Sequence, residues 1–157
     1  MEKSKKLSKN EIKVLVDVII ERKDKEIKDN YREKYKNDVP KELKKLKGPI
    51  IGYIGALDSY KFDYELLKKS ALEYPEYNFV IIGDIALKDR EGSLKELGLE
   101  NITNIHFLGS IPFVKTPKYM AHFDCELIPY VYNDYTIGGC FPVKFFNTLS
   151  AGVPSVV

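Results

Sequence analysis

The sequence predicts an α/β fold, a doubly wound parallel (Rossmann-like) sheet preceded by a helical N-terminal segment. Five short apolar runs, rich in β-branched residues, recur roughly every 20–30 residues after Pro49, as expected for strands. Stretches with helical spacing separate these runs, and alternating strands and helices form parallel sheets with right-handed crossovers. The runs are continuous rather than alternating, which is typical of strands covered on both faces.

Residues 1–48 form a charged segment that we expect to be mainly helical. Ser8 and Glu11 have the spacing of a capping box. Apolar residues then recur every three or four positions, as on the buried face of an amphipathic helix. This stripe consists of Ile12, Leu15, Val16, Ile19 and Ile20. Because several of them are β-branched, a strand through residues 14–20 is the alternative.

The domain boundary is expected near Gly48, where Gly48-Pro49 interrupts the charged segment. Residues 49–157 then form the Rossmann-like domain. The last expected strand has nothing after it to cover it, and the first 48 residues are too few for a second domain of this kind. We therefore expect a fragment whose Rossmann-like domain is incomplete at its C-terminus.

The elements of this domain follow one another regularly. Strands are expected at 49–55, 77–83, 104–109, 124–130 and 153–157. Helices are expected at 63–74, around 93–97, at 115–123 and at 142–151. Asp63 is a plausible N-cap, Pro117 suits a first helical turn, and Gly152 follows the end of the last helix. A loop containing tyrosine and glycine joins the fourth strand to the last helix.

Composition excludes several functional classes. A formal net charge of +2 gives no reason to expect nucleic acid as a partner, since such binding usually needs a clustered basic face. No apolar run approaches the ~20 residues of a transmembrane helix, and the first residues lack the apolar core of a signal peptide. Cys125 and Cys140 fit no metal-ligand spacing. A cytoplasmic setting is therefore expected.

Glycines follow three of the first four expected strands, at Gly55, Gly83 and Gly109. Ligands of open parallel sheets bind beyond the carboxyl ends of the strands. A glycine there lets the backbone approach a ligand and exposes N–H donors. The alternative explanation for each glycine is ordinary turn formation.

The loop before the last helix has the features of an anion site. Thr136, Gly138 and Gly139 lead into Pro142, which suits the first helical position. Free N–H groups at such a helix start favour a diphosphate. Lys144 lies in the first turn, where the helix dipole disfavours a cation. A ligand phosphate would explain this lysine, and a solvated lysine is the alternative. No Ser/His/Asp arrangement or metal-ligand cluster is visible, so no catalytic residue is predicted.

Four segments of the sequence, in order, carry a family resemblance. They are IIGYIGALDSYKFDYELL, YNFVIIGD, NIHFLGSIPFVKTPKYMAHFDCELIPY and FPVKFFNTLSAGVPSVV. Their succession over residues 37–157 resembles the C-terminal domain of GT-B glycosyltransferases, notably the bacterial cell-wall and capsule group related to teichuronic acid synthesis. The most specific piece is P-x-K followed by A-G-x-P-x-V-V.

The resemblance implies one half of a two-domain enzyme. In this family two Rossmann-like domains face each other across a cleft. The C-terminal domain binds the nucleotide-diphosphate sugar, and the N-terminal domain binds the acceptor. The implied reaction transfers a sugar to a hydroxyl acceptor in cell-surface polysaccharide synthesis, in the cytoplasm or peripheral to the inner face of the membrane. The expected substrate is a UDP- or GDP-sugar, with no other cofactor and no metal.

The strand exits and the resemblance together give a set of candidate donor-binding residues. They are Gly55, Ala56, Gly83, Leu108, Gly109, Ser110, Ile111, Thr136, Gly138, Gly139, Lys144 and Asn147. By resemblance, Gly55 and Ala56 border the diphosphate and sugar, and residues 108–111 frame the nucleobase. The loop at 136–139 meets the diphosphate and the transferred sugar, and Lys144 matches a lysine common in the group.

Two departures from the family pattern bear on activity. Asn147 stands where many members carry a glutamate that binds the ribose hydroxyls, and an amide lacks the charge-assisted strength of that bond. A companion glutamate of some members falls at Gly139. With the acceptor domain missing as well, the isolated chain is expected to be inactive. A non-catalytic remnant or nucleotide-binding module of the same fold is the alternative. A receiver-like signalling domain needs acidic residues at the first and third strand exits, where glycines stand here.

Overall fold

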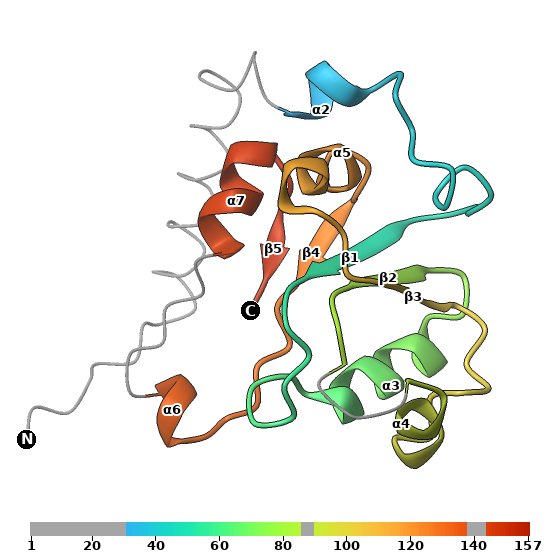
Figure 1. The fold of residues 1–157 in the computed structure, drawn as a ribbon, viewed down its shortest axis with the longest axis vertical. Helices are drawn as coiled ribbons and strands as arrows, with labels where there is room; N and C mark the ends of the chain where they lie inside the picture. Colours follow the sequence, from blue (N-terminus) through green and yellow to red (C-terminus); the bar gives the residue numbers. More distant parts are fainter. Residues whose placement is uncertain (1–30, 86–89, 138–143) are drawn as a thin grey trace, which may run out of the picture.

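The continuous apolar runs form a five-stranded, all-parallel sheet with the strand order β3-β2-β1-β4-β5 (Figure 1). The computed structural model describes residues 31–85, 90–137 and 144–157. The strands are β1 (Ile50–Ile54), β2 (Asn78–Ile82), β3 (Ile105–Gly109), β4 (Cys125–Leu127) and β5 (Ser155–Val156). Each strand lies within its expected range, so the predicted doubly wound parallel fold is confirmed.

The helices expected after Pro49 also form, within the described residues. They are α3 (Tyr64–Glu73), α4 (Arg90–Glu96), the 3-10 turn η1 (Phe113–Lys115), α5 (Thr116–Met120) and α7 (Lys144–Ala151). The side chain of Asp63 accepts a 2.8 Å hydrogen bond from the amide of Leu66, as predicted for an N-cap. The expected start of the last helix, at Pro142, lies outside the described residues. Across those residues we find no helix both long enough and apolar enough to cross a membrane.

The sequence predicts a loop between the fourth strand and the last helix, but a single helical turn, α6 (Asp134–Ile137), forms there. Asn133 and Thr136 stabilise this turn reciprocally. The Asn133 side-chain oxygen accepts from the amide of Thr136, and the Thr136 hydroxyl accepts from the amide of Asn133, each at 3.0 Å. Such local side-chain bonds satisfy the otherwise unpaired amides at a helix start.

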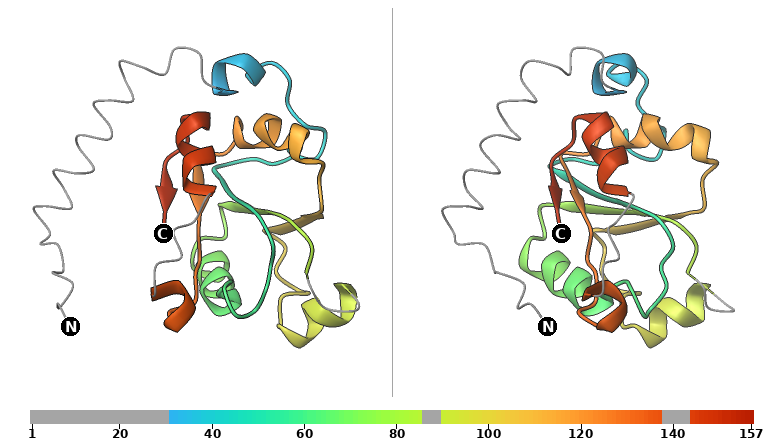
Figure 2. Two further views of the ribbon diagram at one scale, coloured as in Figure 1. Left: turned by 60° about the vertical axis from the view of Figure 1, so that its left-hand side comes forward. Right: turned by 90° about the vertical axis from the view of Figure 1, so that its left-hand side faces the viewer.

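Helices α3 and α4 cover one face of the sheet, and α5 and α7 cover the other (Figures 1 and 2). The packing of strand β2 explains why the four residues after Asn78 are all apolar. Phe79 and Ile81 belong to the core under α3, while Val80 and Ile82 belong to the core under α5 and α7. All five residues of β2 are buried. A strand covered on both faces therefore has no position for an exposed polar side chain.

The described part of the N-terminal segment packs on the face covered by α5 and α7. Its helix α2 (Tyr31–Tyr35) lies beside α5 (Figure 1). Arg32 donates to the carbonyl of Phe123 at 3.2 Å, and Leu43 is buried in the same core as Ile50. The helix expected over residues 12–20 lies outside the described residues. The domain boundary near Gly48 stays a prediction.

The strand order places a topological switch point between β1 and β4. From β1 the chain adds β2 and then β3 on one side, and it then crosses back to add β4 and β5 on the other side of β1. Connections therefore leave the carboxyl ends of β1 and β4 in opposite directions. In open parallel sheets this divergence opens the crevice in which ligands bind.

A substitution at Gly52 tests how closely β1 packs against the helical layer. A Cβ atom at this position would lie 2.0 Å from the ring of Phe123, which is fully buried. We expect Gly52→Ala to lower the free energy of unfolding by about 3 kcal/mol, because an overpacked core must shift. Urea denaturation followed by circular dichroism measures this change.

Gly98→Ala is the matched control for this prediction. Gly98 has a φ of 63°, and an added Cβ would meet only the flexible end of Lys68. Its cost should come from backbone conformation alone, about 1 kcal/mol. Equal stability of Gly52→Ala and the wild type would contradict the packing described here.

Candidate functional site

The carboxyl ends of β1, β2 and β3 are joined through their backbones. The amide of Gly55 donates to the carbonyl of Ile82, and the amide of Gly83 donates to the carbonyl of Gly109, both at 2.9 Å. A Cβ atom on Gly83 would lie 1.9 Å from the carbonyl oxygen of Gly55. The close approach that requires Gly83 is therefore between the turns themselves, which supports turn formation as the reason for this glycine.

A pocket of about 300 Å³ lies over these strand exits. It is lined by Ile54, Gly55, Ala56, Ile82, Gly83, Asp84, Ser110, Ile111, Phe113 and Thr116. Within the described ranges, the amides of Ala56, Ser110 and Ile111 donate no hydrogen bond to another residue. The pocket thus combines apolar walls with backbone donors, the combination found in many small-molecule sites.

The structure brings five of the candidate residues together in this pocket, namely Gly55, Ala56, Gly83, Ser110 and Ile111. Leu108 instead packs against the core under α5 and α7, and the carbonyl of Gly109 is bonded to Gly83. Thr136 does not line the pocket, and its hydroxyl donates to the carbonyl of Val131 at 2.5 Å.

Besides Lys144, three candidates remain. Asn147 is exposed on α7, one turn after Lys144. Gly138 and Gly139 lie outside the described residues.

Lys144 lies at the switch point, beside the exit of β1. Its Nζ atom is 2.8 Å from the hydroxyl of Tyr53 and 3.9 Å from the centroid of that ring. The ring of Tyr130, which follows β4, is 5.4 Å away. A Cβ atom added to Gly55 would come within 2.6 Å of Nζ. The structure therefore places the lysine next to the glycine that the sequence analysis assigned to the diphosphate.

Tyr53 fixes the position of this lysine. Its hydroxyl donates to the carbonyl of Ala56 at 2.7 Å and accepts from Lys144. The side chain is almost fully buried in β1. Burial is the largest cause that raises the pKa of Tyr53 well above its ordinary value, so the ring stays neutral. The cation of Lys144 is thus held by a neutral hydroxyl and an aromatic face.

Glu126 of β4 is a buried acid that the sequence analysis did not single out. Its carboxyl is hydrogen-bonded to the hydroxyl of Thr148 on α7. The other oxygen, Oε1, has no hydrogen-bond partner among the described residues. Burial raises the pKa of Glu126 to about 7, although the charge of Lys144 and the backbone of Ile54 favour the ionised form. An acidic residue inside the apolar run DCELIPY was the available signal.

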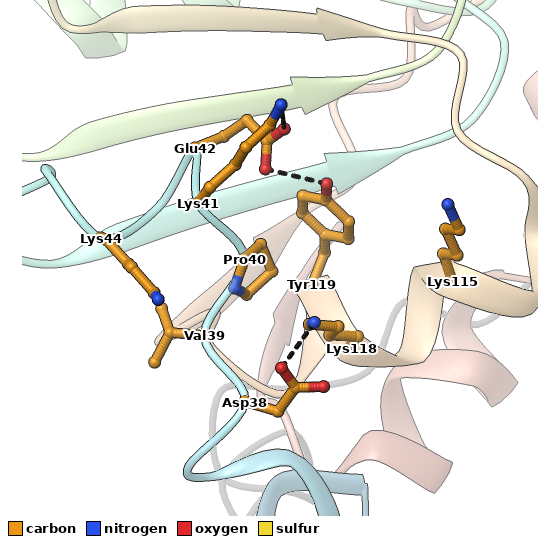
Figure 3. A pocket seen from close by; sticks show the side chains of 9 residues that line it. All are labelled: Asp38, Val39, Pro40, Lys41, Glu42, Lys44, Lys115, Lys118 and Tyr119. Carbon is orange, nitrogen blue, oxygen red and sulfur yellow. Dashed lines mark hydrogen bonds and ion pairs between the residues drawn. The ribbon is translucent and has the colours of Figure 1, made fainter.

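A larger pocket of about 630 Å³ lies away from the strand exits, between residues 38–44 and the η1–α5 segment (Figure 3). Lysines border it, but carboxylates compensate part of their charge. Figure 3 shows Lys118 directed at Asp38, 2.6 Å away, and Tyr119 bonded to Glu42 at 3.0 Å. The pocket contains none of the residues at the switch point. It is therefore a less suitable site for a diphosphate than the pocket over the strand exits.

The sequence matches no protein-family profile. It is 30% identical over 109 residues to TuaH of Bacillus subtilis (strain 168), which is assigned to teichuronic acid biosynthesis as a glycosyltransferase. The matched region is 69% of this chain and 26% of TuaH. The chain thus spans about a quarter of the length of this relative.

Several solved structures share the fold. HepE from Anabaena, in complex with UDP-glucose, matches with a TM-score of 0.52 and 20% identity, over 69% of this chain and 29% of HepE. Sucrose-phosphate synthase from Thermosynechococcus elongatus matches with a TM-score of 0.54 and 19% identity, over 80% of this chain and 29% of the synthase. WaaG, a glycosyltransferase of lipopolysaccharide biosynthesis, matches with a TM-score of 0.51 and 18% identity, over 81% of this chain and 32% of WaaG.

The fold and the sequence comparison therefore show a Rossmann-like domain that is similar to part of GT-B glycosyltransferases. The predicted resemblance to these enzymes is confirmed, in sequence by TuaH and in fold by HepE, the synthase and WaaG. This chain is a homologue of TuaH that corresponds to part of the longer relative.

The buried carboxyl of Glu126 predicts a pH-dependent stability. Its folded pKa, about 7, lies above its ordinary value of 4.5. The folded state therefore loses stability relative to the unfolded chain as the pH rises from about 4.5 to about 7. Glu126→Gln stays neutral, so it should gain up to about 3 kcal/mol relative to the wild type between pH 4.5 and pH 8.

Urea denaturation at pH 4.5, 6 and 8 measures this difference. Glu73→Gln, an exposed position on α3, is the control and should differ from the wild type by the same small amount at every pH. A Glu126→Gln variant whose stability relative to the wild type does not change with pH would rule out a buried, neutral carboxyl.

Proposed function

We propose that this chain is the donor-binding half of a glycosyltransferase that transfers a sugar from a nucleotide-diphosphate sugar to a hydroxyl acceptor. The observation that carries the proposal is the position of Lys144, beside Gly55 at the switch point of the sheet. The adjoining pocket offers the amides of Ala56, Ser110 and Ile111. A cation and nearby unpaired amide donors suit a diphosphate.

The same groups suit the chemistry of sugar transfer. As the bond between the sugar and the diphosphate breaks, negative charge develops on the departing diphosphate. A fixed cation and oriented amides stabilise that charge without reorganising during the reaction. In this proposal Lys144 supplies the cation and the turns after β1 and β3 supply amides. No metal or further cofactor is required in this scheme.

The proposed donor is a UDP- or GDP-sugar. The structure of HepE, which shares the fold, contains UDP-glucose. The turn after β3 contributes Ser110 and Ile111 to the pocket, which agrees with a nucleobase framed by residues 108–111. The exposed side chain of Asn147 is proposed to face the ribose.

The acceptor side of the reaction is proposed to come from another domain or chain. The assignment of TuaH to teichuronic acid biosynthesis supports a role in cell-surface polysaccharide synthesis. Such a role fits a protein that works in the cytoplasm or at the inner face of the membrane. The chain by itself is proposed to bind the donor and to be inactive as a transferase.

Calorimetry with UDP-, GDP- and dTDP-sugars tests donor binding. We expect the folded chain to bind at least one of them, and Lys144→Met to weaken that binding about tenfold, or about 1.4 kcal/mol. Lys69→Met, an exposed lysine on α3, is the matched control and should bind like the wild type. If folded protein binds none of these sugars, the proposal is wrong.

A non-catalytic remnant of the same fold is the second candidate, and Asn147 is the residue that favours it. A glutamate at this exposed position on α7 could accept charge-assisted bonds from a ribose, which are about twice as strong as those of an amide. If the site is otherwise intact, Asn147→Glu should tighten binding of the nucleotide sugar about fivefold in the same calorimetry. Unchanged affinity would instead favour a site that has lost its function.

A further inference from the structure

The hydroxyl of Thr148 is placed between two acceptors. It lies within hydrogen-bonding distance of the Glu126 carboxyl and is 2.8 Å from the backbone carbonyl of Lys144. A hydroxyl has one proton, so it can donate to only one of them. If Glu126 carries a proton, it donates to the oxygen of Thr148, and Thr148 donates to the carbonyl of Lys144. Each of these two hydrogen bonds then has its own proton.

Burial also favours the neutral acid. Glu126 is completely inaccessible to solvent, and its Oε1 atom has no hydrogen-bond partner in the described part of the chain. A carboxylate with an unsatisfied oxygen is far more costly to bury than a neutral carboxyl group. The pKa of about 7 that burial produces agrees with this geometry.

The charged and titratable groups facing Glu126 are few. Among the described residues, Lys144 faces it from α7 and Tyr53 faces it from β1. Strand β5 contributes Ser155, which is paired with Glu126 and does not titrate. Since Tyr53 remains neutral, Lys144 is the one cation in this set. Ionisation of Glu126 therefore changes the electrostatic environment of Lys144 directly.

We propose that Glu126 is a positioning residue for donor binding. While the carboxyl group of Glu126 is neutral, Lys144 stays beside the pocket. Once that carboxyl group is ionised, it draws Lys144 away from the donor. On ionisation the carboxyl proton passes to solvent. The hydroxyl of Thr148 then donates to the carboxylate and leaves the carbonyl of Lys144, which loosens the first turn of α7. The attraction of the new carboxylate competes with a diphosphate for the same ammonium group. The effect on the donor rests on the proposed function, whereas the coupling between the two side chains does not.

Two measurements on the full chain test this proposal. The first is a carbon-13 NMR titration of the Lys144 Cε signal, identified by its loss in Lys144→Met. We expect this signal to shift with the same midpoint as the Glu126 carboxyl, and the shift to vanish in Glu126→Gln. The second is the affinity for UDP-glucose at pH 6 and pH 8.5, a range in which its diphosphate keeps a constant charge. Wild-type affinity should fall at least fivefold, and Glu126→Gln should change less than twofold.

The outcomes separate this proposal from the proposed function. A Lys144 titration that is unchanged in Glu126→Gln overturns the coupling, as does an equal fall in affinity in both proteins. A coupled titration without binding of UDP-glucose at either pH supports the coupling and counts against the proposed function. If Glu126→Gln does not fold, Thr148→Ser should keep the wild-type midpoint of the Lys144 shift and Thr148→Val should move it. An identical midpoint in all three proteins would overturn the proposal.

Discussion

The site depends on how α7 is held against the carboxyl ends of β1 and β4. Two polar contacts do this, the hydrogen bond between Thr148 and Glu126 and the hydrogen bond from Lys144 to Tyr53. Both join α7 to strands that are distant in the sequence, and both are shielded from solvent on the strand side. Displacing one partner of such a buried polar contact costs free energy, because the other group is left without a hydrogen bond. The position of the lysine at the switch point follows from that constraint.

The architecture was largely predictable from the sequence because helices cover both faces of the sheet (Figures 1 and 2). The run from Phe79 to Ile82 is apolar at successive positions for this reason, and Asp63 marked the start of α3 through its capping side chain. The turn at α6 was missed because its stability comes from the reciprocal bonds of Asn133 and Thr136 rather than from an apolar stripe. Thr136 itself was assigned to the donor site, but its hydroxyl is used inside this turn.

The site was predictable only in part, for a related reason. Five of the candidate residues lie together because glycines and turns after parallel strands must meet at one edge of the sheet. Glu126 and Tyr53 could not be assigned in this way, since their roles arise from contacts between segments far apart in the chain. The similarity to HepE and WaaG at 20% and 18% identity shows that the sheet itself persists through extensive substitution. Function has to be argued from the residues at the strand exits, because a shared fold does not determine it.

The turns of Gly55 and Gly83 give the pocket a floor made of peptide groups. The two backbones approach so closely that position 83 has no room for a side chain, because a Cβ there would lie 1.9 Å from the carbonyl oxygen of Gly55. This part of the pocket is therefore shaped by backbone atoms rather than by side chains. The rim is different, since Phe113 is 75% exposed and packs against little else. Under the proposed function, exchanging rim residues would change which base or sugar is selected, without rebuilding the backbone surface proposed to meet the phosphates.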